Sequence, residues 1–189
     1  MADPADNDPV PRPWTRVAVR AERDYRIFRT RTLDVLDPRN GTPYVRTVID
    51  APDWVNVIPV TEAGEVVLVR QFRFGTWSNT LEIPGGMLDP GEDALTAAGR
   101  ELEEETGFRP GRVSALGISH PNPAILVNRL HSFLAEGCVK VHAGKQDGSE
   151  DIQVVIVPRA DLPGLVRAGT ITHSLVLAAL LYDAWRPGA

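Results

Sequence analysis

The stretch Gly86–Phe108, GMLDPGEDALTAAGRELEEETGF, decides how the rest of the chain has to be organised. It predicts a helix that begins near Pro90, because proline suits the first helical position. Asp89 is placed to cap this helix, and Glu92 follows three residues later, where its carboxylate can bond the cap in return. Gly107 favours a left-handed residue that ends the helix. One short segment therefore contains a turn, a helix and a defined end.

The two faces of this helix are predicted to differ. Three apolar residues recur at spacings of three and four and indicate a buried stripe: Leu95, Ala98 and Leu102. Glu101, Glu104 and Glu105 lie three and four residues apart, so they project together from consecutive turns. Negative charge is unfavourable there, since the helix dipole is negative at the C-terminal end and the carboxylates repel one another. We expect a cation to compensate.

The compensating cation is predicted to be a metal ion. Carboxylates and backbone carbonyls are the hard oxygen ligands that Mg²⁺ and Mn²⁺ prefer, and the Gly85-Gly86 pair supplies carbonyls. We assign four metal ligands: Gly85, Glu101, Glu104 and Glu105. Arg100 is expected to orient these carboxylates by ion pairing. The choice between Mg²⁺ and Mn²⁺ stays open, and a solvated acidic face without an ion is the alternative.

The complete spacing of the stretch is more specific than any of its parts. Its fixed positions are Gly86, Glu92, Arg100, Glu101, Leu102, Glu104, Glu105, Gly107 and Phe108. This pattern closely resembles the signature of the Nudix hydrolases, position for position. The resemblance implies metal-dependent hydrolysis of a pyrophosphate, with Arg100, Glu104 and Glu105 as catalytic residues. Glu92 is expected to fix the geometry of the loop and the helix.

Composition and charge limit the class of function. With 189 residues, 43% apolar and 24% charged, the chain is ordinary for a globular protein. Its net charge of −5 argues against binding to nucleic acid, whose phosphates it would repel. The longest apolar run, Leu175–Tyr182, is too short to span a bilayer. Cys138 is the single cysteine and excludes an intramolecular disulfide, and no signal peptide is evident, so we expect a cytoplasmic location.

The chain is predicted to have three parts. Residues 1–13 are rich in proline and aspartate and indicate a disordered leader. Residues 14–51 alternate in polarity around an Asn40-Gly41 turn and predict a small antiparallel β-sheet, suited to dimerisation or to a lid. Residues 52–189 are assigned to the catalytic domain. The predicted fold class is α+β, with a Nudix-type α/β/α sandwich around a mixed sheet, and the resemblance implies a homodimer.

Features outside the motif resemble one subgroup, the ADP-ribose pyrophosphatases. These features are the segments VRQFR and LEIPGGMLDPGE, together with Pro123, which stands sixteen residues after Gly107. The resemblance implies a small nucleotide substrate, with ADP-ribose cleaved to AMP and ribose 5-phosphate. Another nucleotide sugar, a dinucleoside polyphosphate or a non-canonical nucleotide would use the same motif. A nucleotide-sensing module without catalysis ranks lower, because such a module is expected to lose acids that this chain keeps.

Five residues are candidates for substrate binding: Trp54, Arg70, Arg73, Glu82 and Pro123. Arg70 and Arg73 end a predicted core strand and are expected to share a face and to meet a phosphate or a ribose, since guanidinium offers a planar fork of donors. Solvated arginines at a sheet edge are an equal alternative. Glu82 stands shortly before the Gly-Gly pair and is expected to touch substrate or a neighbouring donor, with a surface strand residue as an equal alternative.

The catalytic base is less clearly indicated. Glu150 is expected to be a mobile ligand or base, in a segment that resembles the E-x-E-D-I of similar enzymes. Gly148 replaces the first glutamate of that segment, which leaves the base open. His120, in a proline-rich loop, is a minor alternative. Ser119 and His173 do not form a hydrolase triad here, because no G-x-S-x-G motif is present.

Overall fold

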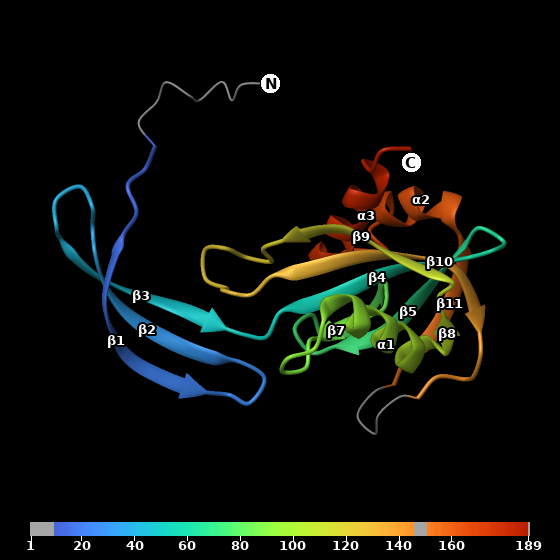
Figure 1. Ribbon diagram of the computed structural model, residues 1–189, viewed down its shortest axis with the longest axis horizontal. Coiled ribbons are helices and arrows are strands. Elements are labelled where there is room, and N and C mark those ends of the chain that lie inside the picture. Colours follow the sequence, from blue (N-terminus) through green and yellow to red (C-terminus); the bar gives the residue numbers. More distant parts are fainter. Residues whose placement is uncertain (1–9, 146–150, 189) are drawn as a thin grey trace. The chain divides into compact units, whose positions relative to one another are not determined.

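The computed structural model describes residues 10–145 and 151–188. The chain divides into two compact units (Figure 1). Unit 1 comprises Met1–Ala51 with Ala124–Val127, and unit 2 comprises Pro52–Pro123 with Asn128–Ala189. Part of the predicted leader, residues 1–9, lies outside the described residues.

Unit 1 is a three-stranded antiparallel sheet, as the sequence predicts. Its strands are β1 (Thr15–Asp24), β2 (Arg29–Leu36) and β3 (Pro43–Asp50). Between β2 and β3 the chain reverses through Gly41, whose φ of +73° lies in the left-handed region that glycine adopts without strain. The Gly41 N–H donates to the Asp37 carbonyl at 2.8 Å, and Arg39 pairs with the Asp37 carboxylate. The turn predicted at Asn40-Gly41 is therefore confirmed.

Unit 2 is built, within the described residues, on a sheet of eight strands (Figure 1). The strands are β4 (Trp54–Thr61), β5 (Glu65–Arg73), β6 (Ser78–Glu82), β7 (Gly85–Met87), β8 (Phe108–Arg109), β9 (Arg112–Ser119), β10 (Leu130–Lys140) and β11 (Gln153–Pro158). Five of them follow the order β11-β5-β4-β10-β8, while β6 pairs with β5, β7 with β4 and β9 with β10. β4 and β10 are parallel and the other pairs are antiparallel, so the sheet is mixed.

Helices cover both faces of this sheet (Figure 1). They are α1 (Ala94–Thr106) on one face, and α2 (Leu162–Arg167) and α3 (Ser174–Ala184) on the other, with a 3₁₀ turn at Arg159–Asp161 before α2. Successive residues of β4 point to opposite faces of the sheet: Val57 joins the apolar cluster under α1, and Ile58 joins the cluster under α3. Both are completely buried, and burying each such side chain contributes about 1.5–3 kcal/mol to the stability of the folded protein. The predicted α/β/α sandwich is confirmed.

The start of α1 differs from the prediction. The helix begins at Ala94, and its cap is Asp93, whose carboxylate accepts from the N–H groups of Leu95 and Thr96. The reason is Gly91, whose φ of +82° is incompatible with a helix and makes residues 90–92 a turn. Leu95 consequently lies in the first turn and is 46% exposed rather than buried.

The rest of α1 follows the prediction. Ala98 and Leu102 are completely buried, and Gly107 ends the helix with a φ of +73°. The Glu92 carboxylate accepts from the Asp89 N–H at 3.1 Å, so the predicted bond forms, but inside the turn that precedes the helix. Of the helices among the described residues, none has both the length and the apolar character needed to cross a bilayer.

Candidate active site

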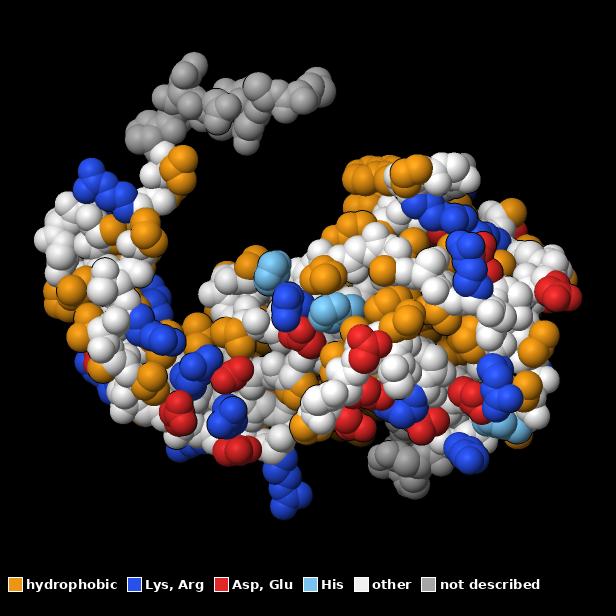
Figure 2. All heavy atoms as spheres, in the orientation of Figure 1, with side chains coloured by type: hydrophobic (Ala, Val, Ile, Leu, Met, Phe, Trp, Pro, Cys, Tyr) orange, Lys and Arg blue, Asp and Glu red, His pale blue; other side chains and the backbone are white. Residues whose placement is uncertain are grey.

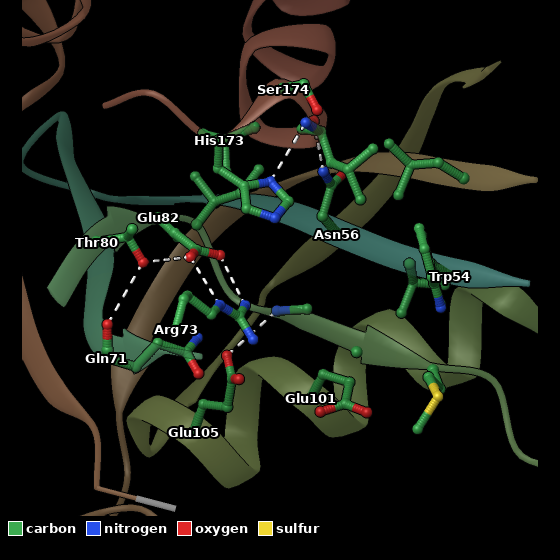
Figure 3. A pocket seen from close by; sticks show the side chains of 18 of the residues that line it. Trp54, Asn56, Gln71, Arg73, Thr80, Glu82, Glu101, Glu105, His173 and Ser174 are labelled. Carbon is green, nitrogen blue, oxygen red and sulfur yellow. Dashed lines mark hydrogen bonds and ion pairs between the residues drawn. The ribbon is translucent and has the colours of Figure 1, made fainter. Parts of the chain in front are cut away.

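A cavity of about 880 Å³ opens in unit 2 beside β7 and α1 (Figure 3). Its lining comes from β4, β5, β6, β7, α1 and the start of α3. Of the residues predicted for the site, seven line it: Trp54, Arg73, Glu82, Gly85, Arg100, Glu101 and Glu105. Strands distant in sequence thus bring most of the predicted residues to one place.

Two glycines allow close contacts around β7, Gly85 with the backbone of β4 and Gly86 with the Glu101 carboxylate of α1. The Gly85 N–H donates to Oε2 of Glu105 at 3.2 Å. A Cβ on Gly86 would lie 2.6 Å from Cδ of Glu101, so a side chain at this position would displace that carboxylate. Gly85 and Gly86 form part of β7 and pair with β4. Only glycine permits this contact between strand and carboxylates.

The three predicted carboxylate ligands do not converge. Glu101 and Glu105 are four residues apart on α1 and both line the cavity. The Glu104 carboxylate is 47% exposed and accepts from Nη1 of Arg100 at 3.1 Å, outside the lining. Within residues 10–145 and 151–188, no group of three or more His, Cys, Asp or Glu side chains is arranged to hold a metal ion.

The pair of carboxylates at the cavity nevertheless fits a divalent cation of the Mg²⁺ type. Mg²⁺ retains several waters and is commonly bound through one or two carboxylates together with substrate phosphates. Glu101 and Glu105 supply hard oxygen atoms, and Glu105 is only 4% exposed. Two like charges in a partly enclosed space are costly unless a cation or donors compensate them. The donor set therefore fits a cation shared with the substrate.

Arg100 is the hub of the ion pairs beside this pair of carboxylates. It donates from Nε and Nη2 to the two oxygens of Glu92, both at 2.9 Å, and from Nη1 to Glu101 at 2.9 Å. These hydrogen bonds raise the pKa of Arg100, and they lower the pKa of Glu92 to about 2. Arg100 thus connects the turn before α1 with Glu101 and Glu104 and fixes their orientation.

A second ion pair crosses the cavity wall between β5 and β6 (Figure 3). Arg73 donates from Nε to Oε1 of Glu82 at 2.8 Å and from Nη2 to Oε2 at 2.7 Å. Thr80 donates its hydroxyl to the same carboxylate at 2.6 Å. Burial raises the pKa of Glu82, but the hydrogen bonds from Arg73 and Thr80 outweigh burial, so the pKa of Glu82 is lowered. Glu82 is therefore a buried, charged group.

The remaining predicted residues lie elsewhere. Arg70 is exposed and donates to Gln153 at 3.2 Å, outside the lining; residues three apart in a strand face opposite sides, so Arg70 and Arg73 do not share a face. Pro123 lies in an exposed loop that does not line the cavity. Glu150, the expected base or mobile ligand, falls outside the described residues.

Sequence reasoning missed the wall contributed by α3. His173 caps this helix, and Ser174 begins it; both line the cavity, with His173 beside Glu82 (Figure 3). Asn56 of β4 holds the helix in place by donating from Nδ2 to the Leu175 carbonyl at 2.9 Å. A capping position before an apolar helical run was a usable signal for His173, but nothing in the sequence indicates that α3 meets β4 here.

Comparison with known proteins places this architecture in a family. The NUDIX domain family matches residues 52–180, more than half of the chain. The ADP-ribose pyrophosphatase of Bacillus subtilis (strain 168) is 29% identical over 161 residues, covering 82% of this chain and 87% of the relative. The GDP-mannose pyrophosphatase of Citrobacter koseri is 30% identical over 170 residues, covering 84% and 88%.

Other relatives show how varied the group is. The methanol dehydrogenase activator of Bacillus methanolicus is 29% identical over 158 residues, covering 83% of this chain and 85% of that protein. A solved structure described as an ADP compounds hydrolase superposes with a TM-score of 0.82 at 23% identity, covering 93% of this chain and 95% of the other. That likeness shows the fold. The chain belongs to the Nudix family and is a pyrophosphohydrolase, as its 23-residue motif predicts.

Proposed function

We propose that this protein hydrolyses the pyrophosphate of a nucleoside diphosphate linked to another moiety, with ADP-ribose as the first substrate and AMP and ribose 5-phosphate as products. The observation that carries the proposal is the pair Glu101 and Glu105, held beside Gly85 and Gly86 at the wall of an 880 Å³ cavity. Cavities of this size accommodate ligands as large as a nucleotide sugar.

The chemistry follows from the charge of a pyrophosphate. When bound, a divalent cation, Mg²⁺ or Mn²⁺, neutralises the phosphate oxygens and polarises the scissile bond. Glu101 and Glu105 would hold it, together with the Gly85 carbonyl, and Glu104 becomes a further ligand only if it leaves Arg100. Arg100 keeps Glu101 oriented, and Arg73, which lies between Glu82 and Glu105 (Figure 3), places positive charge where it can attract a second phosphate oxygen. Glu150 remains our candidate for the base.

The choice of ADP-ribose rests on two kinds of support. The VRQFR segment and the position of Pro123 resemble ADP-ribose pyrophosphatases, and a relative of that name covers 82% of this chain. GDP-mannose pyrophosphatases of similar identity make a nucleotide sugar with another base or sugar the second candidate. We retain Trp54, which lines the cavity, and Pro123 as substrate-binding candidates. Arg70 is the weakest of the substrate-binding candidates, because it donates to Gln153 and does not line the cavity.

The test is product release from a panel of compounds. ADP-ribose, ADP-glucose, GDP-mannose, NADH, diadenosine polyphosphates and nucleoside triphosphates are compared with Mg²⁺, Mn²⁺ or EDTA, for the wild type and Glu105→Gln. Turnover led by ADP-ribose and abolished by EDTA and by the substitution would support the proposal. Faster turnover of another compound would make that compound the substrate in place of ADP-ribose. Tight nucleotide binding without any turnover would indicate a nucleotide sensor.

We also propose that the protein acts as a homodimer. β1 is exposed along all ten of its residues, and it is an edge strand of the unit 1 sheet. Val17 and Val19 of β1 are 60% and 44% exposed, and Figure 2 shows hydrophobic side chains open to solvent on this sheet among lysine or arginine side chains. An edge strand that exposes apolar side chains is a favourable surface for a second copy of the chain.

A further inference from the structure

The cavity has two chemically different ends. One end carries the charged groups of α1 and of the turn before it: Asp89, Arg100, Glu101 and Glu105. Just before α3 and at its start, the lining residues Thr172, His173 and Ser174 are polar and carry no fixed charge. The charges of Arg73 and Glu82 lie between them and offset each other in a two-point ion pair. The second end therefore suits an uncharged, hydrogen-bonding part of a ligand.

His173 is fixed at this end as a hydrogen-bond donor. The Leu175 N–H donates to Nδ1 of His173 at 3.3 Å, so the proton of the neutral imidazole is on Nε2. Burial lowers the pKa of His173 and favours that neutral form, while the nearby charge of Glu82 acts in the opposite direction. Nε2 has no hydrogen-bond partner among the described residues, and it faces the side of the cavity where Glu82 lies (Figure 3).

Asn56 fixes the helix start that carries His173. Its Nδ2 donates to the Leu175 carbonyl at 2.9 Å, and the N–H of the same Leu175 donates to His173. Asn56 is only 5% exposed and lines the cavity next to the α3 N-terminus. The Nε2–H donor of His173 is therefore held in a defined place, where it can donate to a hydroxyl oxygen of a ligand.

Trp54 lies in a different part of the cavity from His173 (Figure 3), which distinguishes a region for a nucleobase from a region for a sugar. Trp54 is the only Phe, Tyr or Trp among the described residues that line the cavity, and it pairs across the sheet with Met87. Figure 3 shows it away from His173, on the other side of Asn56. A nucleobase gains most from stacking on an aromatic ring, and the His173 end offers hydrogen bonds without such a ring.

We propose that His173 forms a subsite for a sugar hydroxyl of the moiety attached to the nucleoside diphosphate, with its Nε2–H as the donor and with Asn56 holding the start of α3 in position. This subsite rests on the proposed function and deepens it, because it names what selects a nucleotide sugar over a bare nucleotide. His173 contacts the part of the substrate that does not react. The contact is therefore made equally in the ground state and in the transition state, and it acts on KM rather than on kcat.

The test separates the two roles of His173, capping α3 and donating to substrate. His173→Asn keeps a side chain that can accept the Leu175 N–H bond, because asparagine is a favoured N-cap, but it lacks the distant Nε2–H donor. His173→Ala removes both roles. Each variant is compared with the wild type on ADP-ribose and on the β-methyl ester of ADP, in which a methyl group replaces the ribose.

His173→Asn is expected to raise KM for ADP-ribose roughly three- to tenfold, with kcat within about twofold and KM for the methyl ester unchanged. Its Tm stays within about 2 °C of the wild type, whereas His173→Ala lowers Tm by about 2–4 °C. An unchanged KM for ADP-ribose in His173→Asn, or an equal rise for both compounds, would overturn the subsite.

A binding experiment keeps this result apart from the proposed function. The dissociation constant of the non-hydrolysable α,β-methylene analogue of ADP-ribose is measured by calorimetry for the wild type and His173→Asn. If the wild type cleaves nothing, the proposed function fails, yet at least threefold weaker binding in the variant still supports the subsite. Equal binding, or no binding by the wild type, overturns the subsite even where ADP-ribose is cleaved.

Discussion

Gly86 and Glu101 lie so close together that a side-chain carbon on Gly86 would overlap the Glu101 carboxylate. Arg100 holds this carboxylate from the other side at 2.9 Å, so it cannot move away without breaking an ion pair. We expect Gly86→Ala to keep the fold and to weaken Mg²⁺ binding about tenfold or more, because one ligand is displaced. Calorimetric titration with Mg²⁺, together with a thermal melt, measures both quantities.

Gly85→Ala is the matched comparison for this substitution. A Cβ on Gly85 would overlap the Val55 carbonyl and lie 2.8 Å from Cα of Asn56, and both of these atoms belong to the β4 backbone. Backbone cannot move aside as a carboxylate can, so we expect Gly85→Ala to lower Tm by several degrees. Equal Tm values for the two alanine variants would contradict this account.

Glu101→Gln and Glu105→Gln are each expected to lower kcat by about a hundredfold or more. Each change removes a negative oxygen ligand from the cation that stabilises the transition state. Glu103→Gln is the control on the same helix: Glu103 pairs with Arg109 and His142, away from the cavity. Steady-state kinetics at saturating Mg²⁺ should leave Glu103→Gln within about twofold of the wild type, and a comparable loss there would refute the assignment.

Arg100→Lys tests the orienting role of the guanidinium. A lysine cannot donate at the same time to Glu92, Glu101 and Glu104, because it lacks the planar fork of donors. We expect kcat to fall about tenfold and the Mg²⁺ dependence to shift to higher concentration, with a small change in Tm. A variant with wild-type Mg²⁺ dependence would show that the carboxylates orient themselves.

The ion pair between Arg73 and Glu82 predicts a specific dependence of stability on pH. The pKa of Glu82 is lowered in the folded protein from its ordinary value of 4.5, so the pair adds stability above pH 4.5. That contribution is lost as the pH falls from 4.5 through the lower pKa of the folded state. Because Arg73 is 40% exposed, we expect Glu82→Gln to cost about 1–2 kcal/mol at pH 7.

Thermal melts of the wild type and Glu82→Gln between pH 7 and pH 3 check this prediction. The difference in Tm between the two proteins should be largest at pH 7 and should shrink below pH 4.5. A difference that stays constant across this range would mean that the charge of Glu82 contributes nothing and that packing alone explains the loss.

The exposed strand β1 predicts a dependence of assembly on its apolar residues. Replacing Val17 and Val19 with lysine places charges on the surface that we propose for the second copy. We expect the variant to elute with half the mass of the wild type in size exclusion with light scattering. A wild type that is monomeric at micromolar concentration would remove the proposal at once.

Local sequence patterns determined much of this molecule. The apolar run that leads to Arg70 and Arg73 predicts a core strand, since a strand that is buried on both faces is apolar at successive positions. Gly107 ends α1 as predicted, because few residues other than glycine adopt its backbone angles without strain. The motif resembles the Nudix signature position for position, and its spacing on a helix fixes which of its residues share a face.

Only the tertiary structure decided which of these side chains meet. Glu82 finds Arg73 nine residues away because the register of β5 and β6 places them at one wall. Glu104 pairs with Arg100 and does not line the cavity, whereas Glu101 and Glu105 do, although all three carboxylates have suitable spacing. These outcomes depend on competition between neighbouring charges and on strand register, neither of which a local period encodes.

The α3 wall shows the limit most clearly. Asn56 and Leu175 are 119 residues apart in the chain, and one hydrogen bond between them places His173 at the cavity. The apolar spacing after His173 favours a helix, because periodicity is a local property of the chain. The position of the helix start in space was decided by how α3 packs on the sheet. Burial of apolar side chains is not directional, so the sequence of α3 alone does not specify which distant segment it contacts.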